Sequence, residues 1–406
     1  MPLLIGNMQA KLPSYKNQVD TASVKVLDPE VLSVPMSQSD QDCKALVEVG
    51  ASVKAGQMIG LKDATGVYVP IYSPVSGEVT GIAKKMSAKL KPCDHVVIRN
   101  DFKNEQVLLE KTVSMESSKA EIIDFIKSLG LMETNALAYR KYDTEAETLI
   151  ISLVEDDPYL VSDVAYAKDH QEAFALGVAL VKKATGAKKA VIVSTSDDPF
   201  ALEIEGSENR ILSAVYPLND EEVLKAKLNE KNGLVVEGNC LVRLGLCASS
   251  KLPVANVYVT VAGEAAGSPV LVSCPIGTSC NDLLACAACT EGTNDLFIGG
   301  PMTGTAVTKA EVVVNQIVNE VTVFPHEEQK SLPCLRCGKC AEVCPKGLIP
   351  VEIVGAFKTS NVEALDKTDI MTCSECGLCA YVCPSKIDVT ENIRRAKRYY
   401  GLKRKK

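Results

Sequence analysis

The sequence of 406 residues has no tryptophan, few aromatic residues and only three histidines, His95, His170 and His326. These three are scattered, so we expect them on the surface or in the core and not as ligands of a metal. No stretch approaches the 18 uninterrupted apolar residues of a membrane span, and the first 16 residues lack the pattern of a signal peptide. We therefore expect a cytoplasmic protein. The net charge of -7 argues against a nucleic-acid binder.

Cysteine, by contrast, is abundant. There are 16 cysteines, and eight of them lie between Cys334 and Cys383. In a reducing compartment, clustered cysteines indicate metal ligands or redox thiols and not a framework of disulfides. The length predicts two to four domains, and the apolar content of 46% is that of an ordinary globular protein.

Four regions with different patterns follow one another and predict a multidomain α+β fold. Up to about residue 115, short β-branched runs alternate with Gly- and Pro-containing turns, as in a barrel or sandwich. Residues 116–235 alternate strands with helices, which predicts an α/β layer, with helices at 119–129, 169–185 and 221–229. Residues 236–305 are rich in strands, and residues 306–406 are largely helical and carry the cysteine cluster.

The first region also resembles the barrel-sandwich hybrid of lipoyl and biotinyl carriers. Two hairpins of the Gly-x-Val type follow one another there, but the segment between them offers only Lys62, without the flanking methionines of a carrier. A scaffold is therefore the better interpretation of this region.

A duplicated cysteine motif carries the chemistry. Both copies fit C-x2-C-x2-C-x3-C-P, the pattern of bacterial ferredoxins that bind [4Fe–4S] clusters. In two-cluster proteins the fourth cysteine of each motif ligates the other cluster. The expected sets are Cys334, Cys337 and Cys340 with Cys383, and Cys373, Cys376 and Cys379 with Cys344. The alternative is a pair of zinc sites, but zinc knuckles usually combine two CxxC pairs or mix Cys with His.

Nearly the whole chain resembles the RnfC family, that is, the C subunit of the Rnf electron-transport complex and its soluble relatives in propanediol and proline-reductase electron transfer. The resemblance rests on Gly56-Gln-Met-Ile-Gly60, Ser73-Pro-Val-Ser-Gly-Glu-Val79, Gly299-Gly-Pro-Met-Thr-Gly304 and the paired cluster motifs. It implies four domains: an RnfC-type barrel-sandwich hybrid (1–115), an α/β domain like the 51-kDa subunit of complex I (116–235), a β-grasp domain of the SLBB type (236–305) and a helical dicluster domain with a basic tail (306–406). In the family, the α/β domain binds FMN and takes hydride from NADH.

This α/β domain is where the chain departs from the family. In place of the glycine-rich phosphate loop stands Gly130-Leu-Met-Glu-Thr-Asn-Ala-Leu137, in which only Gly130 survives. A phosphate cradle needs bare backbone N–H groups, and Glu133 supplies bulk and negative charge instead. We therefore expect a degenerate site that binds neither FMN nor NADH in the family manner. The acidic run Glu155-Asp-Asp157, which aligns with another family signature, is expected to be a solvated turn.

The remaining cysteines leave several interpretations open. Cys286 and Cys289 form a CxxC pair, which indicates either a redox dithiol or cysteines that simply pack in the core. Together with Cys274 and Cys280 upstream, they could instead form a third metal site. A helix expected to start at Leu283 would favour a thiolate at Cys286. Four further cysteines are expected to be structural: Cys43, Cys93, Cys240 and Cys247.

Basic residues mark two places where a partner is conceivable. The tail from Arg394 to Lys406 holds eight Lys and Arg and no acid, which indicates either a solvated end or docking to an acidic protein or an anionic membrane surface. Arg336 and Lys339, beside the first cluster motif, would steer an acidic ferredoxin.

Three functions compete, and none of them assigns a catalytic residue. The first is a flavin-free relay of single electrons through two clusters, between a protein donor and a partner oxidoreductase. The partners would be ferredoxin-like proteins, flavoproteins or a reductase complex. The second is an FMN-dependent NADH:acceptor oxidoreductase subunit, and the third is a scaffold or assembly module with structural clusters.

Overall fold

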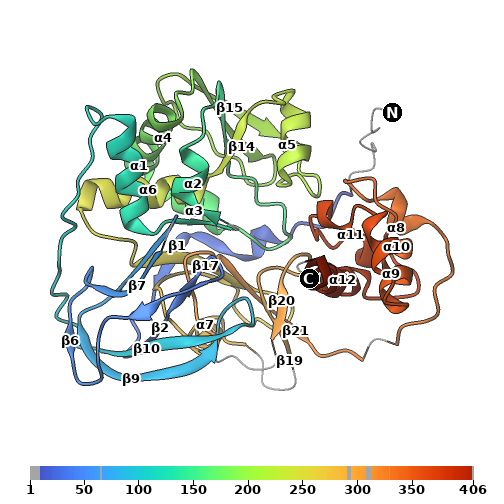
Figure 1. The fold of residues 1–406 in the computed structure, drawn as a ribbon, viewed down its shortest axis with the longest axis horizontal. Coiled ribbons are helices and arrows are strands. Elements are labelled where there is room, and N and C mark those ends of the chain that lie inside the picture. Colours follow the sequence, from blue (N-terminus) through green and yellow to red (C-terminus); the bar gives the residue numbers. More distant parts are fainter. Residues whose placement is uncertain are drawn as a thin grey trace.

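The computed structural model describes residues 10–64, 66–134, 136–289, 294–307, 312–328 and 330–404. A helical C-terminal domain stands beside a larger body, residues 10–325, which is built on several sheets (Figure 1). No helix within the described residues is both long enough and apolar enough to cross a membrane.

The first region forms two small sheets that enclose a common core. A four-stranded antiparallel sheet has the order β2-β10-β9-β6, and a three-stranded sheet has the order β5-β7-β8. Apolar side chains alternate inward, so that Val96 and Ile98 of one strand are fully buried. The strands are β2 (Val31–Pro35), β3 (Ser37–Gln38), β4 (Gln41–Asp42), β5 (Lys44–Ala45), β6 (Ser52–Val53), β7 (Met58–Ala64), β8 (Val67–Tyr72), β9 (Gly77–Met86) and β10 (Pro92–Asn100).

The second region is an α/β layer on a parallel sheet with the order β15-β14-β13-β16. Leu149 and Ile151 face the core with α1, α4 and α6, and Ile150 faces α5 on the other side, as the period of two requires. The strands are β13 (Thr148–Ser152), β14 (Lys189–Thr195), β15 (Ser207–Leu212) and β16 (Leu234–Glu237), with the hairpin β11 (Met132–Glu133) and β12 (Ala136–Leu137). The helices are α1 (Lys119–Leu129), α2 (Ala138–Tyr142), α3 (Ser162–Asp169), α4 (Gln171–Thr185), α5 (Glu221–Leu228) and α6 (Gly238–Ser250). Helix α6 lies beyond the boundary that we expect at residue 235, but it packs into the core of this layer.

One helix boundary differs from the expectation. The single helix expected from Asp169 to Thr185 is wrong at its start, because α3 ends at Asp169 and α4 begins at Gln171. His170 between them has a non-helical backbone, with ψ at 47°. The break lets α3 bury its own apolar face, which includes Val164.

A six-stranded mixed sheet with the order β1-β18-β17-β21-β19-β20 completes the body. It takes β1 from the first region, because Lys25 lies opposite Val272 in a parallel pair, and β21 from the region after residue 305. The domain boundary that we expect between residues 305 and 306 therefore stays a prediction. Strand β21 of this sheet lies after that boundary. The elements are η1 (Lys16–Gln18), β1 (Asp20–Val26), β17 (Asn256–Ala262), β18 (Val270–Pro275), α7 (Cys280–Cys286), β19 (Asn294–Ile298), β20 (Thr305–Val307) and β21 (Glu320–Pro325).

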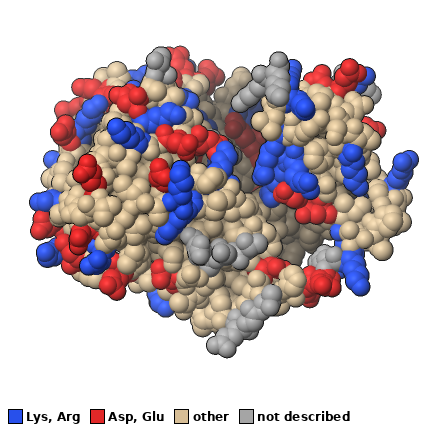
Figure 2. Space-filling view, turned by 60° about the horizontal axis from the view of Figure 1, so that its bottom comes forward, with Lys and Arg blue, Asp and Glu red and all other residues tan. Residues whose placement is uncertain are grey.

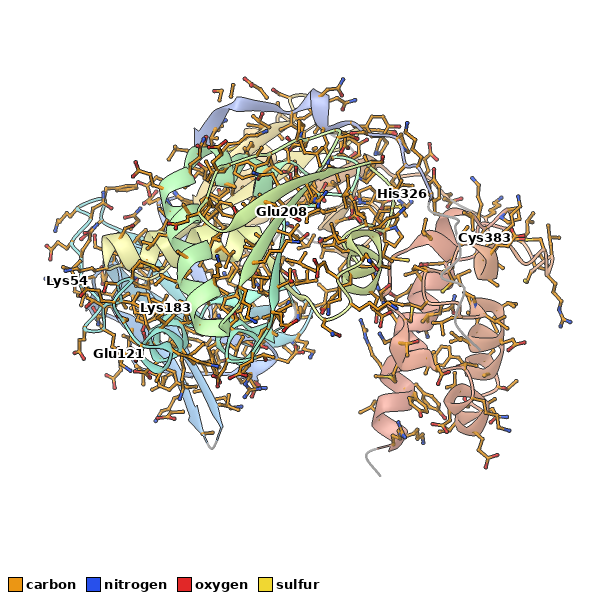
Figure 3. The ribbon with its side chains drawn as sticks, turned by 90° about the horizontal axis from the view of Figure 1, so that it is seen from above. Lys54, Glu121, Lys183, Glu208, His326 and Cys383 are labelled. Carbon is orange, nitrogen blue, oxygen red and sulfur yellow. The ribbon has the colours of Figure 1, made fainter. Side chains whose placement is uncertain are left out.

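The C-terminal domain has a small core of its own. Ile353, Leu365, Ile393 and Tyr400 pack together at the centre, where α12 contacts α9 and α10. The elements are α8 (Lys339–Glu342), α9 (Pro350–Lys358), α10 (Val362–Asp366), η2 (Ile370–Thr372), α11 (Leu378–Tyr381) and α12 (Val389–Arg404). Figure 3 places Cys383 in this domain, far from Lys54 and Glu121 at the other end of the body.

Candidate iron–sulfur site

The two cysteine motifs fold into loops with the same local structure. We call residues 334–340 the first loop and residues 373–379 the second loop. Gly338 and Gly377 hold φ angles of 81° and 84° and start the short helices α8 and α11. In each loop a backbone N–H donates to the first cysteine sulfur at 3.4 Å, from Arg336 to Cys334 and from Glu375 to Cys373. The local backbone is thus shaped around the sulfurs, as a cluster-binding loop requires.

The second loop closes over a cavity together with a cysteine that is distant in sequence. Cys344 joins Cys373, Cys376 and Cys379 in the lining, and Leu378 and Ile393 are among its apolar walls. The Leu348 N–H donates to the Cys344 sulfur at 3.4 Å. Burial raises the pKa of Cys376 to about 11 and that of Cys379 to about 12, so these thiols are protonated without iron. Bound iron would supply the positive charge that holds them as thiolates.

The first loop lies at the surface. Cys334 and Cys337 are exposed, and Cys340 and Cys383 are half-buried. The chain after Cys383 returns to this loop, because the Ser385 hydroxyl donates to the Pro333 carbonyl at 3.0 Å. No group of three or more His, Cys, Asp or Glu side chains within the described ranges is arranged to hold a single metal ion.

The second loop is anchored to the body. The Tyr216 hydroxyl donates to the Cys376 carbonyl at 2.5 Å. A Cβ added at Gly377 would lie 2.4 Å from the Met302 carbonyl oxygen, so the Gly299–Gly304 segment packs directly on this loop. Lys346 adds ion pairs to Asp220 at 2.8 Å and to Glu222 at 2.7 Å across the same junction.

Part of the basic tail is engaged within the chain. Arg394 and Lys397 on α12 pair with Glu375 of the second loop at 3.3 and 2.7 Å. Arg394 also donates to the Thr303 carbonyl of the body at 2.8 Å, and Lys397 donates to the Cys373 carbonyl at 2.9 Å. Figure 2 shows Lys and Arg side chains gathered on the C-terminal domain beside the hollow that separates it from the body. The sequence shows these cations only as a charge run; their role in holding the second loop depends on the fold.

The segment where the resemblance places a phosphate loop is filled by the protein's own side chains. Gly130 ends α1, and Asn135 lies outside the described residues. The buried Glu133 carboxylate accepts hydrogen bonds from the Tyr142 hydroxyl at 2.7 Å and from Lys141 at 2.6 Å. Burial opposes the charge of Lys141, but this neighbouring carboxylate still raises the pKa of the amine. A buried carboxylate in place of free N–H groups does not fit a bound phosphate.

The acidic run that we expected to be a solvated turn is buried, so that expectation is wrong. Glu155 and Asp157 are 1% and 5% exposed. The Glu155 carboxylate accepts the Asp163 N–H at 2.6 Å, at the start of α3. Burial raises the pKa of Asp157 to about 7 and that of Asp156 to about 6. The Gly299–Gly304 segment packs against Asp157, since a Cβ added at Gly300 would lie 2.2 Å from its carboxylate oxygen and the Thr303 hydroxyl donates to it at 3.4 Å. Local sequence does not reveal this packing.

The expected helix start near Cys286 is also wrong. The Ser279 hydroxyl accepts the Asp282 N–H at 3.2 Å and caps α7, so the helix begins at Cys280 and ends at Cys286. A thiolate at Cys286 is therefore not favoured by a helix N-terminus. Burial raises the pKa of Cys289, and the redox dithiol stays a prediction.

The other non-cluster cysteines are all buried: Cys43, Cys93, Cys240, Cys247, Cys274 and Cys280. Burial raises the pKa of both Cys274 and Cys280 to about 12, which keeps their thiols protonated. Their burial agrees with a structural role, since a free cysteine packs like a small apolar residue.

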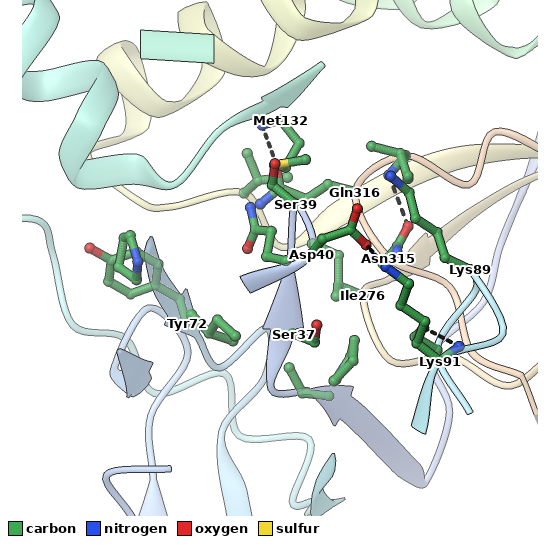
Figure 4. Close-up of a pocket in the computed structure, with 18 of the residues that line it drawn as sticks. Ser37, Ser39, Asp40, Tyr72, Lys89, Lys91, Met132, Ile276, Asn315 and Gln316 are labelled. Atoms are coloured by element: carbon green, nitrogen blue, oxygen red, sulfur yellow. Dashed lines mark hydrogen bonds and ion pairs between the residues drawn. The ribbon is translucent and has the colours of Figure 1, made fainter. Parts of the chain in front are cut away.

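A separate pocket lies between the barrel, the end of α1 and residues 315–317 (Figure 4). No cluster cysteine lines it. Its polar groups are largely satisfied within the chain: Lys91 pairs with Asp40 at 2.7 Å, and Gln316 accepts the Met132 N–H at 3.1 Å. We assign no ligand to this pocket.

Comparisons with known proteins agree with this anatomy. Residues 9–103 match the RnfC barrel sandwich hybrid domain, and residues 333–387 match the 4Fe-4S dicluster domain. The C subunit of the Na(+)-translocating ferredoxin:NAD(+) oxidoreductase complex of Acetobacterium woodii is 26% identical, over 97% of each chain. The C subunit of the ion-translocating oxidoreductase complex of Rhodobacter capsulatus is also 26% identical, over 84% of this chain and 73% of its own.

A solved structure of an NAD+-reducing [NiFe]-hydrogenase in the air-oxidized state is also similar. It has a TM-score of 0.47 and 14% identity, and the match covers 70% of this chain and 63% of that one.

The dicluster domain makes this chain an iron–sulfur electron-transfer protein with 4Fe–4S clusters. The barrel-sandwich domain near the N-terminus and the similar C subunits of ion-translocating oxidoreductase complexes indicate which iron–sulfur proteins this chain resembles. The chain is RnfC-like.

Proposed function

We propose that this chain relays single electrons through two [4Fe–4S] clusters between a protein donor and a partner oxidoreductase. One cluster would be held by Cys334, Cys337, Cys340 and Cys383. The other would be held by Cys373, Cys376, Cys379 and Cys344. When bound, the clusters supply one-electron redox chemistry, and the chain supplies thiolates, N–H donors to sulfur and a partly buried environment that tunes the potential.

The observation that carries this proposal is the cavity under the second loop. Cys344 lies 29 residues before Cys373, yet it shares one lining with the three cysteines of that loop. Such crossed ligation belongs to two-cluster ferredoxins, in which the two clusters lie close enough for an electron to pass between them. Four cysteines in each set leave no iron open to a substrate, which favours a relay over catalysis at the cluster.

The relay would operate without FMN or NADH. Glu133 supports this part of the proposal, because its buried carboxylate takes up hydrogen bonds where a phosphate would need donors. The competing function, an FMN-dependent NADH:acceptor oxidoreductase subunit, draws support from the names of relatives such as that from Acetobacterium woodii. A scaffold with structural clusters is the third possibility.

One preparation distinguishes the three functions. The protein is purified without oxygen, its iron is counted, and the acid-precipitated supernatant is tested for flavin fluorescence. We expect about eight irons per chain and no flavin. One flavin per chain would establish the second function, and iron well below eight would refute the two-cluster assignment. If the clusters are present but no protein donor reduces them, the third function, a scaffold with structural clusters, would be the one that remains.

The partners that we propose are proteins: a ferredoxin-like protein, a flavoprotein or a reductase complex. The relatives from Rhodobacter capsulatus and Clostridium ljungdahlii are subunits of oxidoreductase complexes, which supports a place for this chain in such an assembly. We propose a cytoplasmic location, with the cations of the tail that are not paired to Glu375 available for peripheral contact with a membrane complex.

A further inference from the structure

The duplicated loops allow a position-by-position comparison, and they differ in what surrounds them. Gly377 of the second loop packs against the Met302 carbonyl, whereas a Cβ at its counterpart Gly338 would meet nothing within 4 Å. Leu378 is 1% exposed, whereas its counterpart Lys339 is exposed. The body therefore covers the second loop and leaves the first loop, which has the same local structure, uncovered.

The charge at one equivalent position is also inverted. Glu375 in the second loop and Arg336 in the first loop have nearly the same left-handed backbone, with φ at 59° and 52°. Glu375 is held by two cations of α12. Arg336 is exposed, and among the described residues neither it nor Lys339 forms an ion pair. In the second loop this position therefore holds an acid that is paired with cations of the chain, and in the first loop it holds a cation that forms no ion pair among the described residues.

The surroundings of the first loop add cations and exposed apolar side chains. Every residue from 330 to 339 is exposed, and this stretch includes Lys330, Arg336 and Lys339 but no acid. Leu332 and Leu335 are 60% and 67% exposed. Apolar side chains so exposed, rimmed by cations, are typical of a surface that binds another protein.

The exposed Lys386 lies beside this stretch, because the Leu332 N–H donates to the carbonyl of the neighbouring Ser385 at 2.9 Å. We propose that the face formed by Leu332, Leu335, Arg336, Lys339 and Lys386 is the docking surface of an acidic electron-carrier protein. The inference rests on the proposed function, since it places the exposed cluster at the point of exchange. Complementary charge would steer the carrier, with a carboxylate meeting Arg336 as Glu375 meets Arg394 and Lys397 in the second loop. The two leucines would exclude water at the contact.

The exchange itself is a transfer of one electron. The carrier's redox centre loses one electron as the cluster of the first loop gains one, or the reverse. No bond forms or breaks, and no proton is needed. The chain's own contribution is to bring the carrier close to Cys334 and Cys337, the two most exposed of the eight ligands.

The test uses the iron-loaded full chain and an acidic 2[4Fe–4S] ferredoxin as the probe. Electron transfer is followed by stopped flow, and binding of oxidised ferredoxin by calorimetry, at several salt concentrations. For the charge reversal Arg336→Glu with Lys339→Glu, we expect the second-order rate at low salt to fall at least tenfold. The difference should vanish near 1 M salt, where screening is almost complete. Leu335→Ser should weaken binding at low salt and near 1 M salt alike.

The control is Lys44→Glu, an exposed cation on β5 of the barrel, which should change the rate by less than twofold. Iron content and the EPR signal after dithionite must match wild type in every variant. If wild type lacks clusters, the proposed function fails; if loaded variants react and bind like wild type, only the docking surface is refuted. Two other outcomes would overturn the proposal. If the variants bind ferredoxin like wild type but no longer bind phosphatidylglycerol vesicles, this face binds a membrane. If they bind ferredoxin like wild type but lose a dimer that wild type shows in sedimentation, this face binds a second copy of the chain.

Discussion

Replacing Gly377 by alanine should loosen the second loop from the body, and Gly338→Ala provides the matched control. Both glycines have φ near 80° and stand directly before a short helix, α8 or α11, so both alanines incur the same left-handed strain of about 1–2 kcal/mol. Only at Gly377 does the new Cβ meet backbone, 2.4 Å from the Met302 oxygen and 3.2 Å from its carbonyl carbon. Relieving such a contact requires the loop to move, at a further cost of about 1–3 kcal/mol.

A difference of that size should be visible in hydrogen exchange. It corresponds to a rise of about 5- to 150-fold in the population in which the loop has separated from the body. We expect faster exchange in peptides covering Gly299–Gly304 and Tyr216 for Gly377→Ala, and no such change for Gly338→Ala, with equal iron in both. Tyr216→Phe, which removes the bond to the Cys376 carbonyl without altering the loop, should act in the same direction by about 1 kcal/mol. Equal exchange in the two alanine variants would refute the packing argument.

Three further predictions test other parts of the site. In a double-mutant cycle with Glu375→Gln and Lys397→Met, the rate of iron release to a chelator should reveal a coupling energy of about 1–2 kcal/mol. As a control, a cycle on the exposed pair Lys111 and Asp124, followed by thermal unfolding, should give a coupling energy of less than about 1 kcal/mol. Equal coupling energies for the two pairs would contradict the anchoring role of Lys397. Glu133→Gln should lower the unfolding free energy of the body by about 3 kcal/mol, because it leaves Lys141 without its partner; an unfolding curve like that of wild type would show that the pair is dispensable. Burial raises the pKa of Asp157 from its ordinary value to about 7 in the folded protein, so wild-type stability should fall as pH rises from about 4 to about 7. Asp157→Asn should reduce the loss between pH 5 and pH 7 by about 2 kcal/mol in urea titrations, and an unchanged slope would exclude this carboxyl as its source.

Much of the anatomy follows from local sequence. Helix α1 has the expected bounds, with a Ser118 and Glu121 capping box at its start, and β13 and β14 lie where apolar runs predict them. The barrel and the dicluster domain are likewise evident from turn spacing and cysteine spacing, and both are confirmed. These features are local, because a few neighbouring residues fix each turn, cap or ligand loop.

Where sequence reasoning failed, burial by distant segments was the cause. Glu155 and Asp157 look like a solvated turn in the sequence, but both are buried, Glu155 at the start of α3 and Asp157 against the Gly299–Gly304 segment. In the same way β21 joins the body's sheet although its neighbours in sequence lead to the helical domain.

The sequence by itself determined that this protein has a duplicated cysteine motif and an N-terminal barrel-sandwich domain. Only the tertiary structure decided how the two loops differ. One is clamped by Tyr216, Met302 and the cations of α12, and the other stands open with Arg336 unpaired among the described residues. Spacing along the chain sets the local geometry of each loop equally, but which of them the body covers depends on contacts between residues more than 70 positions apart.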